Sequence, residues 1–343
     1  MKRILALLMV LVMVVGVFAG CSSKPAEEGE AEGGSEEVKA VHLKMNLTTN
    51  ENSTWFLGAS KFKEIVEEKT GGKYIVDIFP SEQLSGGNQV KGLEMVQTGI
   101  TDLDIHSTII YTIMDPKFTV VNMPWMIPTY EEADAMMAGE GGDAIFELAK
   151  ENGIVPLAFG ESGYRQITNS VRPITEAADL DGIKLRVPGI KMFVDLFDVL
   201  GANPTTMNFA EVFTSLQQGT IDGQENPLDI IKSSKLEEVQ EYLSLWNYVY
   251  DALLMSASTK TWEMLTDEEK VIFQEAAIEA MNYQKEQNRK KDEANLAYLK
   301  ENMEVIEVTP EKIAEFKELA QPVYESYEEI IGMELLEIFG YEK

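Results

Sequence analysis

Two short stretches decide the fold and the site of this 343-residue chain: Gly182-Ile183-Lys184-Leu185-Arg186-Val187-Pro188 and Ile221-Asp222-Gly223-Gln224-Glu225-Asn226-Pro227. The first predicts a strand over 182–187 that stops at Pro188, because proline has no N–H for a strand ladder. The second predicts a strand over 221–225 and then a helix, with Asn226 at the N-cap and Pro227 at the first helical position. Ligands of open α/β sheets bind beyond the carboxyl ends of strands. Arg186 and a helix N-terminus at Asn226 therefore predict a site for an anion.

Strands and helices alternate on both sides of these stretches. Before them, the hydrophobic pattern predicts strands over 41–47, 74–79, 102–105 and 154–159, and helices over 56–70, 89–98 and 130–152. After residue 188 it predicts helices over 191–200, 210–218 and 267–302, strands over 249–258 and 305–308, and terminal helices over 310–339 with a break at Gly332. Thr266 and Glu269 form a capping box at the start of the 267–302 helix. The alternating order predicts an α/β protein of two lobes, with parallel strands covered by helices on both faces.

The composition excludes several classes of protein. Lys and Arg number 29 and Asp and Glu 58, which gives a formal net charge of −29. Binding to nucleic acids or to anionic membranes needs a basic surface, which so acidic a composition does not favour. One cysteine rules out a disulfide framework, and two histidines leave little room for a zinc site or a Ser-His-Asp triad.

The sequence offers no positive sign of catalysis. It holds no glycine-rich nucleotide motif, and Gly160-Glu161-Ser162-Gly163 lacks the second glycine of a nucleophile elbow. We therefore predict no catalytic residue, no metal and no cofactor, and we do not expect an enzyme.

Arginine is rare in this chain and concentrated in one part of it. Only five of the 29 basic residues are Arg, and three of them, Arg165, Arg172 and Arg186, lie within 22 residues. Arginine presents a rigid fork of donors that matches a carboxylate or phosphate, whereas lysine is a point charge. On this count alone two interpretations stay open: chance clustering of surface ion pairs, or a site for an anion.

The first forty residues have the pattern of a signal peptide followed by a flexible linker, here called the tether. Met1-Lys2-Arg3, the apolar run from Ile4 to Phe18 and the small pair Ala19-Gly20 predict a signal peptide over 1–20. Cys21 follows at once and resembles the lipidated cysteine of bacterial lipoproteins, although Phe18 stands where leucine is more usual. Residues 21–40, rich in Ser, Gly, Ala and Glu, predict a flexible acidic tether. The alternatives are a signal peptide with a chance cysteine, or an uncleaved anchor.

Several motifs together resemble one family. Residues 182–188, Leu-Gly-Ala-Asn-Pro-Thr at 200–205 and Leu-Gln-Gln-Gly-Thr-Ile-Asp-Gly-Gln-Glu-Asn-Pro at 216–227 are similar to the signature of TRAP-transporter substrate-binding proteins of the DctP type. Residues 67–73 and 78–84 resemble it too. The resemblance implies a two-lobed periplasmic-binding-protein fold with hinge strands and long C-terminal helices that span both lobes. It also implies a protein that captures an organic acid outside the cytoplasm and delivers it to a sodium-coupled permease with one small and one large membrane subunit.

The resemblance also implies roles for individual residues. The arginine that binds the substrate carboxylate falls on Arg186, the asparagine that completes the clamp on Asn226, a second arginine on Arg165, and the aromatic ring that packs on the substrate on Phe209. Further candidates lie in loops expected to face the cleft: Asn52, Trp55, Glu82, Ser107, Tyr248 and Asp251. An acidic side chain in the cleft, Glu82 or Asp251, would favour a hydroxylated ligand over a second carboxylate.

The family also implies how the chain is divided and what it contacts. We expect one lobe over 41–162 and 252–291, and the other over 163–251 and 292–343. The expected partners are a small organic acid, the permease subunits and, through the lipid on Cys21, the outer face of the cell membrane, with the protein itself a monomer. Two other functions stay open: a ligand-sensing lipoprotein that reports to a membrane receptor, and a secreted hydrolase. Which organic acid is bound cannot be predicted from these residues.

Overall fold

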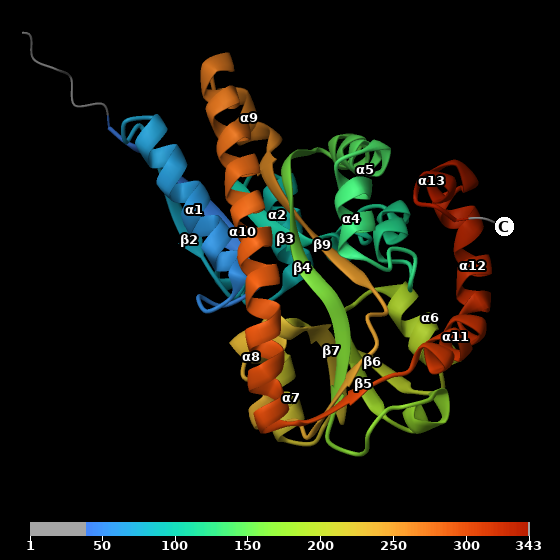
Figure 1. The fold of residues 1–343 in the computed structure, drawn as a ribbon. Coiled ribbons are helices and arrows are strands. Elements are labelled where there is room, and N and C mark those ends of the chain that lie inside the picture. Colours follow the sequence, from blue (N-terminus) through green and yellow to red (C-terminus); the bar gives the residue numbers. More distant parts are fainter. Residues whose placement is uncertain (1–38, 342–343) are drawn as a thin grey trace, which may run out of the picture. The chain divides into compact units, whose positions relative to one another are not determined.

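The computed structural model describes residues 39–341 (Figure 1). The predicted signal peptide, Cys21 and all but the last two residues of the predicted tether lie outside the described residues. Within residues 39–341 no helix is both long enough and apolar enough to cross a membrane.

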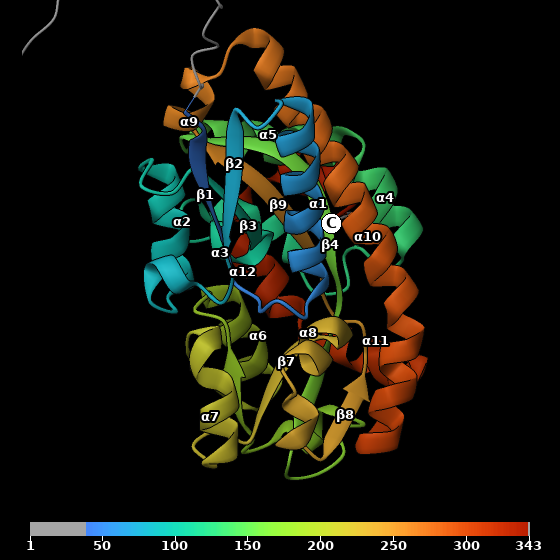
Figure 2. The same cartoon turned by 90° about the vertical axis from the view of Figure 1, so that its left-hand side faces the viewer.

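The described residues form a mixed α/β fold around two hydrogen-bonded groups of strands, which Figure 2 shows one above the other. The strands are β1 (Val41–Leu47), β2 (Tyr74–Phe79), β3 (Leu103–Ser107), β4 (Ile154–Asn169), β5 (Lys184–Val187), β6 (Asn203–Thr206), β7 (Gly223–Pro227), β8 (Tyr242–Leu245), β9 (Tyr250–Ser258) and β10 (Glu304–Glu307). The first group, here called the first sheet, has the order β2-β1-β3-β9-β4. The second sheet has the order β10-β8-β4-β7-β5-β6.

Strand β4 belongs to both sheets. Residues 154–164 pair with β9 in the first sheet, whereas residues 165–169 pair with β7 and β8 in the second. The register shifts between Glu161 and Gly163, and Gly163 has a φ of +102°, a conformation that favours glycine. The bulge therefore lies one residue before the point where the strand changes sheets, and Arg165 is the first residue after that point.

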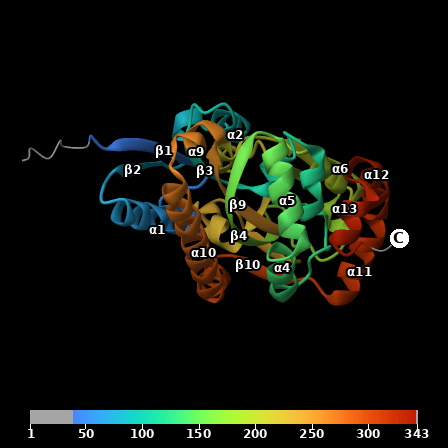
Figure 3. The same cartoon turned by 90° about the horizontal axis from the view of Figure 1, so that it is seen from above.

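The helices cover both faces of the sheets (Figure 3). They are α1 (Thr54–Lys69), α2 (Gln89–Gln97), α3 (Thr108–Tyr111), α4 (Tyr130–Met137), α5 (Glu140–Glu151), α6 (Lys191–Val199), α7 (Val212–Gln217), α8 (Leu228–Ser233), α9 (Thr259–Met264), α10 (Asp267–Asn302), α11 (Pro310–Leu319), α12 (Gln321–Ile331) and α13 (Met333–Ile338). Short 3₁₀ helices link them: η1 (Gln83–Ser85), η2 (Pro116–Asn122), η3 (Ala177–Leu180), η4 (Phe209–Glu211) and η5 (Leu236–Glu238).

The long helix α10 confirms the predicted helix over 267–302, with the capping box between Thr266 and Glu269. It packs along α1 and β4 and reaches α8 and β10. The side chain of Gln284 donates to the carbonyl of Glu161 at 2.7 Å and accepts from its N–H at 2.9 Å. Since β4 is the last strand of the first sheet at this point, Gln284 satisfies backbone groups that no neighbouring strand reaches.

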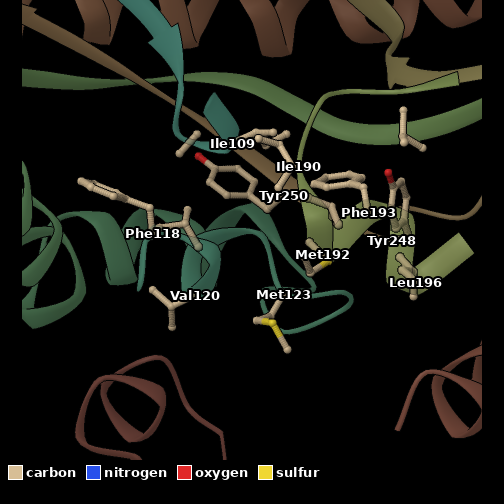
Figure 4. Packing of buried hydrophobic residues seen from close by; sticks show 14 of the residues in the cluster. Ile109, Phe118, Val120, Met123, Ile190, Met192, Phe193, Leu196, Tyr248 and Tyr250 are labelled. Carbon is tan, nitrogen blue, oxygen red and sulfur yellow. The ribbon is translucent and has the colours of Figure 1, made fainter. Parts of the chain in front are cut away.

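Two large cores hold the helices on the sheets. One, between α1, α10 and the first sheet, is centred on Phe62, Tyr74 and Phe273, whose rings meet edge to face. The other runs from η2 and β9 to α6 and the C-terminal helices, and Figure 4 shows Phe118, Phe193 and Tyr248 among its residues. Because this core joins helices on both sheets, it fixes the wall against which the candidate site is built.

Three expectations about the elements are wrong. The predicted helix over 130–152 is two helices, because Gly139 is extended and the run Gly139-Glu140-Gly141-Gly142 is a poor helix former. Asn226 is no N-cap: β7 continues through Asn226 and Pro227, paired with β4, and α8 begins at Leu228. The strands are not all parallel, since β9 runs antiparallel to both β3 and β4.

Candidate ligand-binding site

A cavity lies between residues of the two sheets, with about 30 Å³ of space for the centres of water molecules. Its wall is formed by Thr48, Thr49, Trp55, Gln89, Ser107, Ile109, Ile110, Arg165, Arg186, Pro188, Phe209, Asn226, Ile230 and Asp251. Thr48, Ser107 and Pro188 lie at or just past the carboxyl ends of β1, β3 and β5, where α/β sheets place their ligands. The wall combines apolar side chains with a few charged and polar ones, as in sites for small organic molecules.

Arg186, on β5, is buried but has no acidic partner. Its Nε and Nη2 donate to the carbonyl of Met207 at 3.0 and 2.7 Å, and the guanidinium lies 5.9 Å from the centre of the Phe209 ring. No carboxylate among residues 39–341 forms an ion pair with Arg186. Its Nη1 donates no hydrogen bond to any of these residues. Burial lowers the pKa of Arg186 to about 10, with Arg165 adding to the decrease and Glu225 opposing it. At neutral pH the side chain is therefore a buried cation without a counter-ion among residues 39–341.

Arg165, on β4, is buried in the same wall but is fully paired. Its Nε donates to Glu225, its Nη1 to Asp251, and its Nη2 to the side chain of Glu225 at 2.8 Å and to Asn226 Oδ1 at 3.1 Å. Burial acts to lower the pKa of Arg165, but Glu225 and Asp251 together raise it above its ordinary value. Arg165 thus positions Asn226 and neutralises two acids, and little of its donor fork is left for a ligand.

Glu225, Asp251 and Asn226, the partners of Arg165, make further hydrogen bonds. Tyr248 donates its hydroxyl to Glu225, and burial, followed by the charge of Glu225, raises the pKa of Tyr248 well above its ordinary value. Ser107 donates to Asp251, and burial raises the pKa of Asp251 while Arg165 opposes the increase. Asn226 uses its Oδ1 for Arg165 and one N–H for Gln224, which leaves one amide N–H to donate.

A second buried charge cluster lies behind the wall, in the first sheet. His106 Nδ1 lies 2.7 Å from Asp104, and its Nε2 lies 2.7 Å from Glu82. Burial acts to lower the pKa of His106, but the two carboxylates raise it to about 10, so the ring is an imidazolium at neutral pH. Glu82 also accepts from the hydroxyl of Thr48 at 2.9 Å. This cluster therefore fixes part of the cavity wall without reaching the cavity itself.

The comparisons with known proteins agree with this arrangement. Residues 45–330 match the family model for bacterial extracellular solute-binding protein, family 7, also called DctP. The chain belongs to this family.

Relatives of this DctP protein cover most of its length. It is 37% identical to the solute-binding protein RD1_1052 of Roseobacter denitrificans over 72% of this chain and 75% of that one. A TRAP periplasmic solute-binding protein of Ralstonia eutropha with bound (S)-2-acetolactate has a TM-score of 0.85 and 30% identity, covering 87% of this chain and 98% of that one. Another, of Polaromonas sp., is bound to D-erythronate, with a TM-score of 0.83 and 34% identity over 88% and 99% of the two chains.

Family membership bears out the TRAP solute-binding function and the two-lobed fold with a long C-terminal helix. DctP proteins are binding proteins of transport systems that work outside the cytoplasm. In the described part of this DctP protein, no group of three or more His, Cys, Asp or Glu side chains is arranged to hold a metal ion.

The structure brings seven of the ten predicted site residues to the cavity wall: Arg186, Asn226, Arg165, Phe209, Trp55, Ser107 and Asp251. The other three lie elsewhere. Asn52 is exposed, in the turn before α1, and its backbone N–H bonds to Asn50. Glu82 is turned inward to His106, and Tyr248 is buried behind Arg165. The Glu82 carboxylate and the Tyr248 hydroxyl are stable in these buried positions because each has a hydrogen-bond partner there.

Several wall residues were not predicted: Thr48, Thr49, Gln89, Ile109, Ile110, Pro188 and Ile230. Some of them share a signal that is present in the sequence. Thr48 and Thr49 follow β1, Ile109 and Ile110 follow the end of β3, and Pro188 follows β5. Applying the strand-end rule to every predicted strand, and not only to the one that holds Arg186, finds Thr48, Thr49 and Pro188, whereas the predicted third strand ends at residue 105, too early to indicate Ile109 and Ile110. Gln89 and Ile230 lie on helices and carry no such signal.

Proposed function

We propose that this protein binds the carboxylate of an organic acid through Arg186 and delivers the acid to a sodium-coupled TRAP permease with one small and one large membrane subunit. The observation that carries the proposal is the buried guanidinium of Arg186, which lacks an acidic partner among residues 39–341. Leaving a buried charge unpaired costs several kcal/mol, about 3–5 when a partner is removed from a buried pair. A ligand carboxylate supplies the missing partner and makes charge-assisted, bidentate hydrogen bonds.

The other wall residues complete the site. Asn226 donates its free amide N–H to the carboxylate, Phe209 packs against the carbon chain, and Arg165 holds Asn226 in place while adding positive potential. Trp55 on α1, Ser107 on β3 and Asp251 on β9 line the cavity opposite Arg186. The two solved relatives described above hold acetolactate and erythronate, and both of these ligands are carboxylates.

The two lobes are proposed to close on the ligand, with residues 41–162 and 252–291 in one and 163–251 and 292–343 in the other. The change of partner strands along β4 after Tyr164 supports the first boundary. We further propose that the protein is a monomer without catalytic activity, and that a lipid on Cys21 holds it at the outer face of the cell membrane. The apolar leader and the single cysteine behind Ala19-Gly20 support the anchor.

Titration calorimetry of the purified protein against a panel of organic acids tests the carboxylate site. We expect at least one acid to bind and Arg186→Lys to weaken that binding about 10- to 100-fold, because lysine cannot make the bidentate pair. Arg172→Lys is the matched control: Arg172 lies outside the cavity wall and bonds to the carbonyl of Asp181, so it should bind like the wild type. Equal affinity of the Arg186→Lys protein would show that the bidentate model is wrong.

A further inference from the structure

Charge is distributed unevenly over the cavity wall. Three of its residues are charged, Arg165, Arg186 and Asp251, and two of these are already bonded to each other. Arg165 is also held by Glu225, so its charge is offset twice. One guanidinium, that of Arg186, is left without a counter-ion among the described residues. The wall therefore offers one unpaired cation to a carboxylate, and a second carboxylate on the same ligand would meet no further unpaired cation there.

Asp251 disfavours a second carboxylate on the ligand and also favours a ligand hydroxyl group. Its two oxygens each accept one hydrogen bond, one from Ser107 and one from Arg165. An ionised carboxylate has about four acceptor sites, so two acceptor sites remain. The side chain is 1% exposed and lines the cavity. In such a poorly hydrated place it repels another carboxylate more strongly than it would in water, and it accepts readily from a hydroxyl group.

The remaining wall fits a short and partly hydroxylated carbon chain. Ile109, Ile110, Ile230 and Pro188 offer apolar contact, whereas the hydroxyls of Thr48 and Thr49 and the amide of Gln89 offer neutral hydrogen bonds. None of these groups compensates a second negative charge. Thr48, Thr49 and Gln89 can each form a hydrogen bond with a ligand hydroxyl.

We propose that the cavity selects monocarboxylates that carry a hydroxyl group, with Arg186 binding the carboxylate and Asp251 accepting a hydrogen bond from the ligand hydroxyl. The inference rests on the proposed carboxylate site and adds a specificity-determining residue to it. Asp251 favours hydroxy acids by attraction and disfavours dicarboxylates by repulsion, which are the two parts of a specific site.

Four acids with the same four-carbon chain separate the two effects: butanoate, 2-hydroxybutanoate, succinate and malate. By calorimetry on the purified wild type, we expect 2-hydroxybutanoate to bind about tenfold or more tightly than butanoate, since a hydrogen bond to a charged group is worth about 1.5–3 kcal/mol. Succinate and malate should each bind more weakly than 2-hydroxybutanoate. The reverse order, with a dicarboxylate bound most tightly, overturns the inference.

Asp251→Asn then assigns the selectivity to one residue. The variant keeps the shape and removes the charge, so the gain from the hydroxyl should shrink and succinate should gain affinity relative to 2-hydroxybutanoate. Asp195→Asn is the matched control, because it makes the same chemical change on α6, outside the cavity wall, where Asp195 bonds to Lys191, and it should leave the order of the four acids unchanged. If Asp251→Asn preserves the wild-type ratios, Asp251 is not the selecting residue.

The two proposals fail in different ways. If none of the four acids binds, or if Arg186→Lys binds as tightly as the wild type, the carboxylate site itself is wrong. If acids bind through Arg186 but dicarboxylates are preferred, only the selectivity inference is wrong. Circular dichroism shows whether each variant is folded. If Asp251→Asn is unfolded, the order of the four acids on the wild type decides the inference alone.

Discussion

Arg165 and Arg186 are the same residue type, buried in the same wall, with opposite surroundings. Arg165 is bonded to two carboxylates, and its pKa is raised above the ordinary value. Arg186 bonds only to a backbone carbonyl and an aromatic ring, and its pKa is lowered to about 10. The comparison shows that the role of a buried cation depends on whether the protein supplies its counter-ion. The paired one supports structure, and the unpaired one is available to a ligand.

The largest effect that tests this comparison is the loss of Arg165. Arg165→Met leaves Glu225 and Asp251 buried without a cation, so the free energy of unfolding should fall by about 3–5 kcal/mol. Urea unfolding followed by circular dichroism measures the decrease. A fall of less than about 1 kcal/mol would contradict the structural role of Arg165.

His106 provides a second paired cation, outside the cavity wall but equally buried. His106→Gln keeps one hydrogen bond but removes the charge between Asp104 and Glu82, and we expect a loss of about 3 kcal/mol. The same urea titration measures it. An unchanged midpoint would mean that the imidazolium contributes nothing that a neutral amide cannot supply.

The pH dependence of that difference gives the sign of the His106 contribution. The folded pKa of about 10 lies above the ordinary value of 6.5, so the stabilisation is complete below about pH 6.5 and is lost as the pH rises through 10. The gap in unfolding free energy between the wild type and His106→Gln should therefore narrow between pH 7 and pH 10. A gap that widens over this range would show that the folded ring binds its proton less tightly than the unfolded one.

A smaller effect on stability is expected for Arg186. Arg186→Met removes the cost of burying an unpaired charge but leaves the Met207 carbonyl without its donor, so the free energy of unfolding without ligand should stay the same or rise by about 1 kcal/mol. The stabilisation that a bound acid gives to the wild type should be absent in thermal melting of this variant. A loss of stability equal to that of Arg165→Met would erase the contrast between the two arginines.

The smallest effect belongs to a paired cation that is exposed. Lys191 bonds to Asp195 one helical turn along α6, and 78% of its side chain is exposed. Lys191→Ala should leave the unfolding midpoint within the error of the measurement, since solvent and salt screen such pairs. A clear loss would show that pairing alone, without burial, explains the role of Arg165.

Sequence patterns predicted the elements whose signals are local. The capping box at Thr266 and the periodicity behind it predicted α10, and Pro188 marked the end of β5 correctly. The strand β4 was predicted only over 154–159, because Gly160 and Gly163 are typical of a loop, whereas here they accommodate Met281, Gln284 and a bulge. A glycine in a strand lets another element approach closely, but the sequence does not show which element does so.

The candidate site divides in the same way. Arg186 could be predicted because residue type and strand end coincide at one position. The state of Arg165 could not, since its partners Glu225 and Asp251 lie 60 and 86 residues further along the chain. Asn226 was predicted at the site through a helix cap that does not exist, and it reaches the cavity from β7 instead. Which cation stays free depends on contacts that only the folded chain creates.

The passage of β4 through both sheets has a mechanical consequence. When one sheet rotates against the other about this strand, an atom moves in proportion to its distance from the axis. Arg165 lies on β4 itself, where the lever arm is close to zero, whereas Arg186 lies on β5, two strands away in the second sheet. If the lobes close by such a rotation, it would leave Arg165 beside its carboxylates and carry Arg186 toward or away from Ser107 on β3 and Trp55 on α1.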